Sequence, residues 1–110
     1  MTAKPAVLRP AAVIDVEDAT AYYAQEGGTA LATRWVGALE AAFRHISLHP
    51  ATGSTRYAAV LDLPGLRFSA VTRFPYLIFY LECDDHLDVW RVLQAQKNIP
   101  AWLAEQDKIA

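Results

Sequence analysis

The sequence predicts one α+β domain over residues 1–110: a small antiparallel sheet with an N-terminal helical hairpin packed on one face and a short C-terminal helix. Two observations lead to this prediction. An amphipathic helical pattern before Pro50 is divided by Gly27 and Gly28, and three strand-like stretches follow that proline. Because neither helix is apolar all round, their shared apolar stripe needs a flat surface to cover, and the sheet supplies it.

The N-terminal stretch predicts a short strand followed by a helix. Residues 6–9 are a candidate first strand, closed by Pro10. Asp15 has the side chain of a good N-cap, so we expect the first helix to begin there. We expect it to end at Gly27 and Gly28, because glycine is typical of helix C-termini.

The second predicted helix runs from a cap at Thr29 to Pro50. The short connection between the two helices makes them antiparallel neighbours. We interpret Trp35 and Phe43 as core anchors rather than ligand-binding residues. The apolar stripe of this helix, at spacings of three and four, consists of Leu31, Trp35, Leu39, Ala42, Phe43 and Ile46.

After a loop-rich segment at 51–64, the chain predicts three consecutive strands. The first is the alternating stretch 66–71, and the second, 74–81, has the apolar composition of a strand buried on both faces. A polar turn at 84–86 leads into the third strand, 87–96. Alternation places Leu87, Val89, Arg91, Leu93 and Ala95 on one face of this strand, and Asp88, Trp90, Val92, Gln94 and Gln96 on the other.

The chain is expected to close with a short helix over residues 98–108, with Pro100 in its first turn. Trp102 on this helix either docks the helix onto the sheet or is exposed for a partner. Docking is favoured, because a helix this short is marginal in isolation.

Composition narrows the possible functions. A net charge of −2 argues against a broad basic surface for nucleic acid. No apolar run is long enough to span a membrane, and Cys83 is the only cysteine, so we expect a cytoplasmic protein without an internal disulfide. The three histidines and the cysteine lack paired ligand spacing, and no glycine-rich phosphate loop is present. We therefore expect no metal and no cofactor.

The charges are unevenly distributed along the chain. The segment from Arg34 to Arg73 holds five arginines and only two acidic residues. The tip of the last predicted hairpin carries acids and no base. This pattern indicates either ordinary solvated surface or a polarised protein with a partner on each side. The acids at the tip are Glu82, Asp84, Asp85 and Asp88.

Several motifs are spread over nearly the whole chain. In order they are 12–18 with Tyr22-Tyr23, 30–43, His49-Pro50 with Gly53, Leu63-Pro-Gly-Leu-Arg67, Pro75-Tyr-Leu-Ile-Phe-Tyr80 and Val89-Trp-Arg-Val-Leu93. With these motifs in this order, the chain resembles the ParE/RelE superfamily of type II toxin–antitoxin toxins, and the ParE branch most closely. It departs from the family at one position. Members commonly continue from the Arg-Val-Leu strand into a histidine, and here that residue is Gln94.

The resemblance implies a small toxin neutralised by a ParD-like antitoxin encoded beside it, in a hetero-oligomer. The ParE branch implies inhibition of DNA gyrase by protein binding, without a catalytic centre. The RelE branch implies a ribosome-dependent messenger RNA endonuclease. A third interpretation is an inactive interaction module with the same fold.

The residues favour the non-enzymatic branch. Cleavage of RNA through its 2′-hydroxyl needs a base, an acid and cations for the phosphorane charge. The cations are available, but Gln94 cannot transfer a proton. His45 and His49 fall near a helix end, where interaction with the helix dipole is the more common role. We therefore predict no catalytic residues. The candidate cations are Arg67, Arg73, Arg91 and Lys97.

Partner binding, to the antitoxin or to the target, is the predicted role of the remaining candidates. If Arg91 points outward, it joins Arg67, and in a wider version of the patch Arg73 as well, in a basic patch suited to an acidic antitoxin tail or a target carboxylate. If Trp90 points outward, the sheet presents an aromatic anchor. The competing interpretations are core packing for the tryptophan and an intramolecular salt bridge to Asp62 or Asp88 for the arginines. The predicted partner-binding residues are Arg67, Arg73, Trp90, Arg91, Gln94, Lys97 and Trp102.

Overall fold

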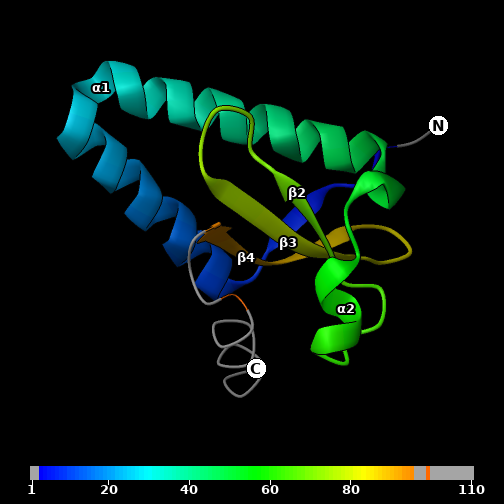
Figure 1. The fold of residues 1–110 in the computed structure, drawn as a ribbon. Coiled ribbons are helices and arrows are strands. Elements are labelled where there is room, and N and C mark those ends of the chain that lie inside the picture. The colour runs from blue at the N-terminus through cyan, green and yellow to red at the C-terminus, as the bar shows by residue number, and fades with distance from the viewer. Residues whose placement is uncertain (1–2, 96–98, 100–110) are drawn as a thin grey trace.

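The structure, a computed structural model, describes residues 3–95 and residue 99. A mixed four-stranded sheet lies between one long, bent helix and a short second helix (Figure 1). The elements in chain order are β1 (Ala6–Leu8), α1 (Pro10–Leu48), a 3₁₀ turn η1 (Pro50–Thr52), α2 (Arg56–Val60), β2 (Arg67–Ala70), β3 (Tyr76–Glu82) and β4 (Leu87–Gln94).

The strands lie in the order β1-β4-β3-β2. β2, β3 and β4 form the predicted antiparallel meander. β1 pairs with β4 in parallel, through Ala6 opposite Leu87 and Leu8 opposite Val89. The prediction of a wholly antiparallel sheet was therefore wrong. A three-residue strand carries no sequence signal for its direction, which follows from the side on which α1 returns the chain to the sheet.

Helix α1 begins at Pro10 rather than at Asp15. Proline suits the first helical position, because its fixed φ is helical and its missing N–H would have no partner there. Arg9 precedes it in extended conformation, with no side-chain cap. Asp15 therefore lies inside the helix, and the prediction of an N-cap at this residue was wrong.

The structure has one long helical element where two helices were expected. Its backbone leaves helical geometry only at Gly27 and Gly28, the position of the predicted break. Gly28 has φ +71°, a left-handed conformation that favours glycine. Figure 1 shows two arms diverging from this bend, the first arm being residues 10–26 and the second residues 29–48. A hydrogen bond of 3.0 Å from Trp35 Nε1 to Thr20 Oγ1 joins the arms.

The main core lies between both arms of α1 and one face of the sheet. Trp35 is fully buried there, as predicted, and Phe43 packs half-buried at the edge of this core. The central members are Ala12, Ala19, Trp35, Leu39, Ile46, Ile78, Tyr80, Leu87, Val89 and Val92. Burial of the apolar side chains in this core is the largest favourable contribution to the stability of the fold.

A second core covers the opposite face of the sheet. α2 lies over this face, within the segment predicted to be loop-rich. A five-residue helix without side-chain caps has little stability of its own, so it depends on packing, here of Tyr57 against Phe68 and Phe79. Of the predicted C-terminal helix, only Ile99 is described, and it is buried in this second core.

A β-bulge changes the alternation of β4. Phe79 of β3 is opposite Arg91, and the next residue, Tyr80, is opposite Val89, so Trp90 is an extra residue. Leu87, Val89 and Val92 therefore face α1, whereas Trp90 and Leu93 face the second core. The predicted alternation was correct as far as Trp90, which lies on the face opposite Val89, and wrong beyond it, because the bulge shifts its phase by one residue.

Candidate functional site

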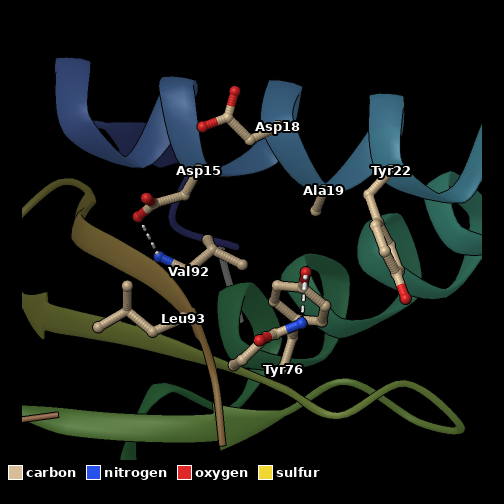
Figure 2. A pocket seen from close by; sticks show the side chains of 8 residues that line it. Asp15, Asp18, Ala19, Tyr22, Tyr76, Val92 and Leu93 are labelled. Carbon is tan, nitrogen blue, oxygen red and sulfur yellow. Dashed lines mark hydrogen bonds between the residues drawn. The ribbon is translucent and has the colours of Figure 1, made fainter. Parts of the chain in front are cut away.

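A pocket of about 260 Å³ lies between the first arm of α1 and the end of β4. Figure 2 shows this region, with side chains from the helix above and from β3 and β4 below. Its lining is polar as well as apolar, because aspartates and tyrosines line it together with aliphatic side chains. The lining residues are Asp15, Asp18, Ala19, Tyr22, Tyr76, Val92, Leu93 and Gln94.

Asp15 is the residue of this pocket that joins the helix to the sheet. Its carboxylate accepts hydrogen bonds from Arg91 Nε at 2.7 Å and from Arg91 Nη2 at 2.8 Å. It also accepts the backbone N–H of Val92 at 3.0 Å, the contact drawn in Figure 2. The Asp15 and Arg91 side chains are only 11% and 9% exposed. The bidentate geometry is the strong form of such a pair. The carboxylate of Asp15 offsets the positive charge of the Arg91 guanidinium.

Tyr76 and Gln94 form the floor of the pocket. Gln94 Nε2 donates to the Tyr76 hydroxyl at 3.3 Å, a long hydrogen bond. Burial raises the pKa of Tyr76, and the neighbouring charges of Tyr22, Asp15 and Asp18 raise it further, whereas the Gln94 hydrogen bond lowers it. Tyr76 therefore remains protonated at neutral pH, so it can donate a hydrogen bond but is a poor general base.

The arrangement is better suited to binding than to phosphoryl chemistry. Asp18 points away from β4 in Figure 2 and is exposed, so it adds negative charge near the mouth. Tyr22 is 49% exposed. A phosphate group entering here would meet one unpaired carboxylate and a guanidinium already bound by another. The pocket is thus unfavourable for an anion.

The arginines predicted to form a basic patch have different environments. Arg91 is 7% exposed beneath α1, and it therefore does not contribute to an outward-facing patch. Its partner is Asp15, not Asp62 or Asp88. Arg67, on β2, donates to the backbone carbonyl of Gly53 at 2.8 Å. Glycine is required at position 53, since a Cβ there would collide with the Tyr80 hydroxyl and with Arg67.

Arg73 is the exposed member of this group. It lies in the turn between β2 and β3 with φ +71°, and the described part of the chain offers it no ion pair or hydrogen bond. It is the predicted partner-binding arginine that presents its charge to solvent most directly.

Trp90 packs in the second core and is 5% exposed. The guanidinium of Arg9 lies 4.0 Å from the centre of the indole ring and is held there by an ion pair of 2.9 Å to Asp88. The two alternatives for the last strand were Arg91 outward and Trp90 outward. Both were wrong, because both side chains are buried. Lys97 and Trp102 lie outside the described residues. The partner-binding role of the seven predicted residues stays a prediction.

His45 and His49 lie at the end of α1, with ring centres 5.5 Å apart, and both are exposed. Over residues 3–95 and 99, no group of three or more histidine, cysteine, aspartate or glutamate side chains could hold a metal ion. In the same part of the chain, no helix is both long and apolar enough to cross a membrane.

Sequence reasoning missed Asp15, Tyr22 and Tyr76 as members of one site. The signal that could have revealed the first was Pro10, which marks the helix start and places Asp15 in the second turn, beyond the reach of a cap. Nothing in the local sequence indicated its partner, since Arg91 lies 76 residues away.

Comparison with known proteins extends these observations. A family model described as "ParE toxin of type II toxin-antitoxin system, parDE" matches residues 6–99, from β1 to Ile99. Among solved structures, the chain is similar to one described as "Chromosomal ParDE TA system from P. aeruginosa", with 15% sequence identity and a TM-score of 0.68. The superposition covers 83% of this chain and 95% of that one, a likeness of fold. No curated protein sequence matches.

Proposed function

The chain belongs to the ParE toxin family of type II toxin–antitoxin systems, and from this premise we propose that it is the toxin of such a pair. In this proposal a ParD-like antitoxin neutralises it in a hetero-oligomer, and the toxin inhibits DNA gyrase by binding to it. The structural relative is described as part of a ParDE system, which supports pairing with a ParD-type partner.

The bidentate Asp15–Arg91 pair is the observation that carries the non-catalytic part of the proposal. An RNA-cleaving site needs a cation free to bind the phosphorane oxygens and a group that transfers a proton. Here the guanidinium in the pocket is bound by a buried carboxylate, and the adjacent Tyr76 has a raised pKa. Gln94, which also lines the pocket, has no titratable group. These features support binding as the mode of action.

The proposal is tested by induced expression of the chain in bacteria, with and without the neighbouring antitoxin gene. Growth, plasmid supercoiling and messenger RNA integrity are measured in the same cultures. We expect growth arrest, altered supercoiling and intact messenger RNA, with growth restored by the neighbouring gene. Arrest with rapid loss of translation and cleaved messenger RNA would instead support the RelE-type endonuclease. Absence of arrest would support an inactive interaction module.

Purified protein provides a direct test of the target. Supercoiling of relaxed plasmid by DNA gyrase is measured with increasing toxin, and again after preincubation with the antitoxin. We expect supercoiling to fall with toxin and to recover with antitoxin. Unchanged supercoiling at a large excess of toxin would reject gyrase as the target and leave the toxin–antitoxin pairing to the growth experiment.

A further inference from the structure

The pocket between the first arm of α1 and the end of β4 carries a negative charge that the described residues do not compensate. Asp15 and Asp18 both line it. The guanidinium of Arg91 binds Asp15 and offsets its charge. Asp18 is exposed and makes no ion pair or hydrogen bond within residues 3–95 and 99. Two carboxylates and one guanidinium leave one negative charge at the mouth of the pocket, which attracts a cation.

An aromatic ring stands beside the Asp18 carboxylate. Tyr22 follows Asp18 by four residues on α1, so the two are neighbours on the surface of the helix. The Tyr22 ring packs edge-on against Tyr23, with ring centres 5.2 Å apart, and 49% of the residue is exposed. In Figure 2 its side chain descends from the helix toward the sheet, on the side of the pocket away from Asp15. A half-exposed ring that is held in place binds a cation with little loss of entropy.

Gln94 adds a hydrogen-bond acceptor from the sheet. Its Nε2 donates to the Tyr76 hydroxyl at 3.3 Å, and this leaves Oε1 of the same amide as an acceptor for a ligand in the pocket. The size of the pocket limits that ligand. Its volume of about 260 Å³ is below the range of about 300–1,000 Å³ that is typical of pockets for drug-sized molecules, so it suits a group the size of one side chain.

We propose that this pocket binds a guanidinium group, supplied either by a small free guanidine or by an exposed arginine side chain of another protein. The N–H groups of the guanidinium donate to the Asp18 carboxylate and to Gln94 Oε1, and its plane stacks on the Tyr22 ring. A guanidinium fits this set better than an ammonium does, because it is planar, more weakly hydrated and has donors that point in several directions.

Another cavity of the protein has the opposite charge and provides an internal control. It has a volume of about 520 Å³, lies between the second arm of α1 and the turn joining β2 to β3, and is lined by Arg34, Thr72 and Arg73 among others. Both arginines repel a guanidinium. A probe that binds through its positive charge therefore distinguishes the two cavities, whereas a probe that binds through its apolar part does not.

The test is an NMR titration of the purified protein with butylguanidinium, butylammonium and neutral N-butylurea, which share one alkyl chain. The side-chain amide of Gln94 reports on the pocket, and the backbone amide of Thr72 reports on the other cavity. We expect butylguanidinium to shift the Gln94 signal with a Kd on the order of 1 mM, butylammonium to bind several-fold more weakly, and N-butylurea to give no saturable shift. The Thr72 signal is expected to stay unchanged.

Variants of the pocket identify the groups that bind. Asp18→Asn is expected to weaken the binding of butylguanidinium about tenfold, and Tyr22→Leu about threefold. Tyr22→Phe keeps the ring and is expected to bind as the wild type does. Glu17→Gln is the matched control for the charge, because this residue is exposed on the same helix and lies outside the pocket. Circular dichroism verifies that each variant is folded.

The proposal is overturned if butylguanidinium gives no saturable shift of Gln94, if N-butylurea binds equally well, or if Asp18→Asn leaves the affinity unchanged. A blocked alanine peptide with one central arginine distinguishes the two sources of the group. Binding of this peptide at least as tightly as butylguanidinium would support an arginine side chain as the ligand, and binding of butylguanidinium alone would support a small free guanidine. These outcomes do not depend on the toxin assignment, because only the purified chain is titrated.

Discussion

Asp15 and Arg91, 76 residues apart in the chain, form a bidentate ion pair that joins the first arm of α1 to β4. The same carboxylate accepts the backbone N–H of Val92, so it satisfies three donors at the point where the helix crosses the sheet. Because both side chains are almost completely buried, neither charge can be compensated by water if its partner is removed.

Replacement of Asp15 by alanine is therefore expected to lower the free energy of unfolding by about 3–5 kcal/mol, because it leaves a buried guanidinium without its carboxylate. Urea unfolding monitored by circular dichroism measures the change. Asp18→Ala, on the same helix but exposed, is the control and is expected to change stability by less than about 0.5 kcal/mol.

A double variant distinguishes loss of the charge from loss of the packing. Asp15→Leu combined with Arg91→Met removes both charges, so it is expected to lose less stability than Asp15→Leu alone. Equal losses in the two variants would show that the ion pair contributes nothing beyond the volume of its side chains.

The bend of α1 provides a matched pair of glycine substitutions. Gly28→Ala forces a side chain into φ +71° and is expected to destabilise the protein by about 1–2 kcal/mol. Gly37→Ala, at a helical position in the second arm, is expected to stabilise it by about 0.5–1 kcal/mol through the unfolded state. An added Cβ meets no neighbouring atom within 4 Å at either position, so the difference reports backbone conformation alone. The measurement is thermal unfolding of the two variants. If both were stabilised, the left-handed conformation of Gly28 would be refuted.

Three buried tyrosines predict a loss of stability at high pH. Burial is the main cause that raises the pKa of Tyr23, Tyr76 and Tyr80 above the ordinary value near 10. The folded protein then retains protons that the unfolded chain releases, so stability is fully present below pH 10 and falls as the pH rises through the folded pKa values.

Urea unfolding between pH 8 and 11 measures this slope, with Tyr80→Phe as the test variant. The substitution removes the hydrogen bond from the Tyr80 hydroxyl to the Pro50 carbonyl, so overall stability is expected to fall while the slope becomes shallower. A slope identical to that of the wild type would show that Tyr80 does not contribute to the alkaline loss.

Gln94→His tests whether a titratable side chain alone would convert the pocket to RNA cleavage. We expect neither the wild type nor the variant to cut messenger RNA in a ribosomal translation assay, since Arg91 remains bound to Asp15 in both. A ribosome-dependent endonuclease measured in parallel is the positive control. Cleavage that appears only with the histidine would show that the ion pair does not prevent catalysis.

Local sequence patterns predicted most of the secondary structure. The glycine pair at the bend, the apolar stretch of β3 and the polar turn before β4 are signals carried by neighbouring residues, and the structure confirms all three. α2 was missed because five residues without caps form a helix only through packing on Phe68 and Phe79. The parallel pairing of β1 was missed because a short strand does not encode its direction.

The sequence by itself determined the order of the four strands and the long helix, the break in α1 and the resemblance to the ParE family, because each depends on residue types at short spacings. Only the tertiary structure decided that Asp15 binds Arg91, that the bulge at Trp90 turns Val92 toward α1, and that Arg34 and Arg73 line one groove. These relationships join residues far apart in the chain, and they depend on how helix and sheet pack together, which no local pattern specifies.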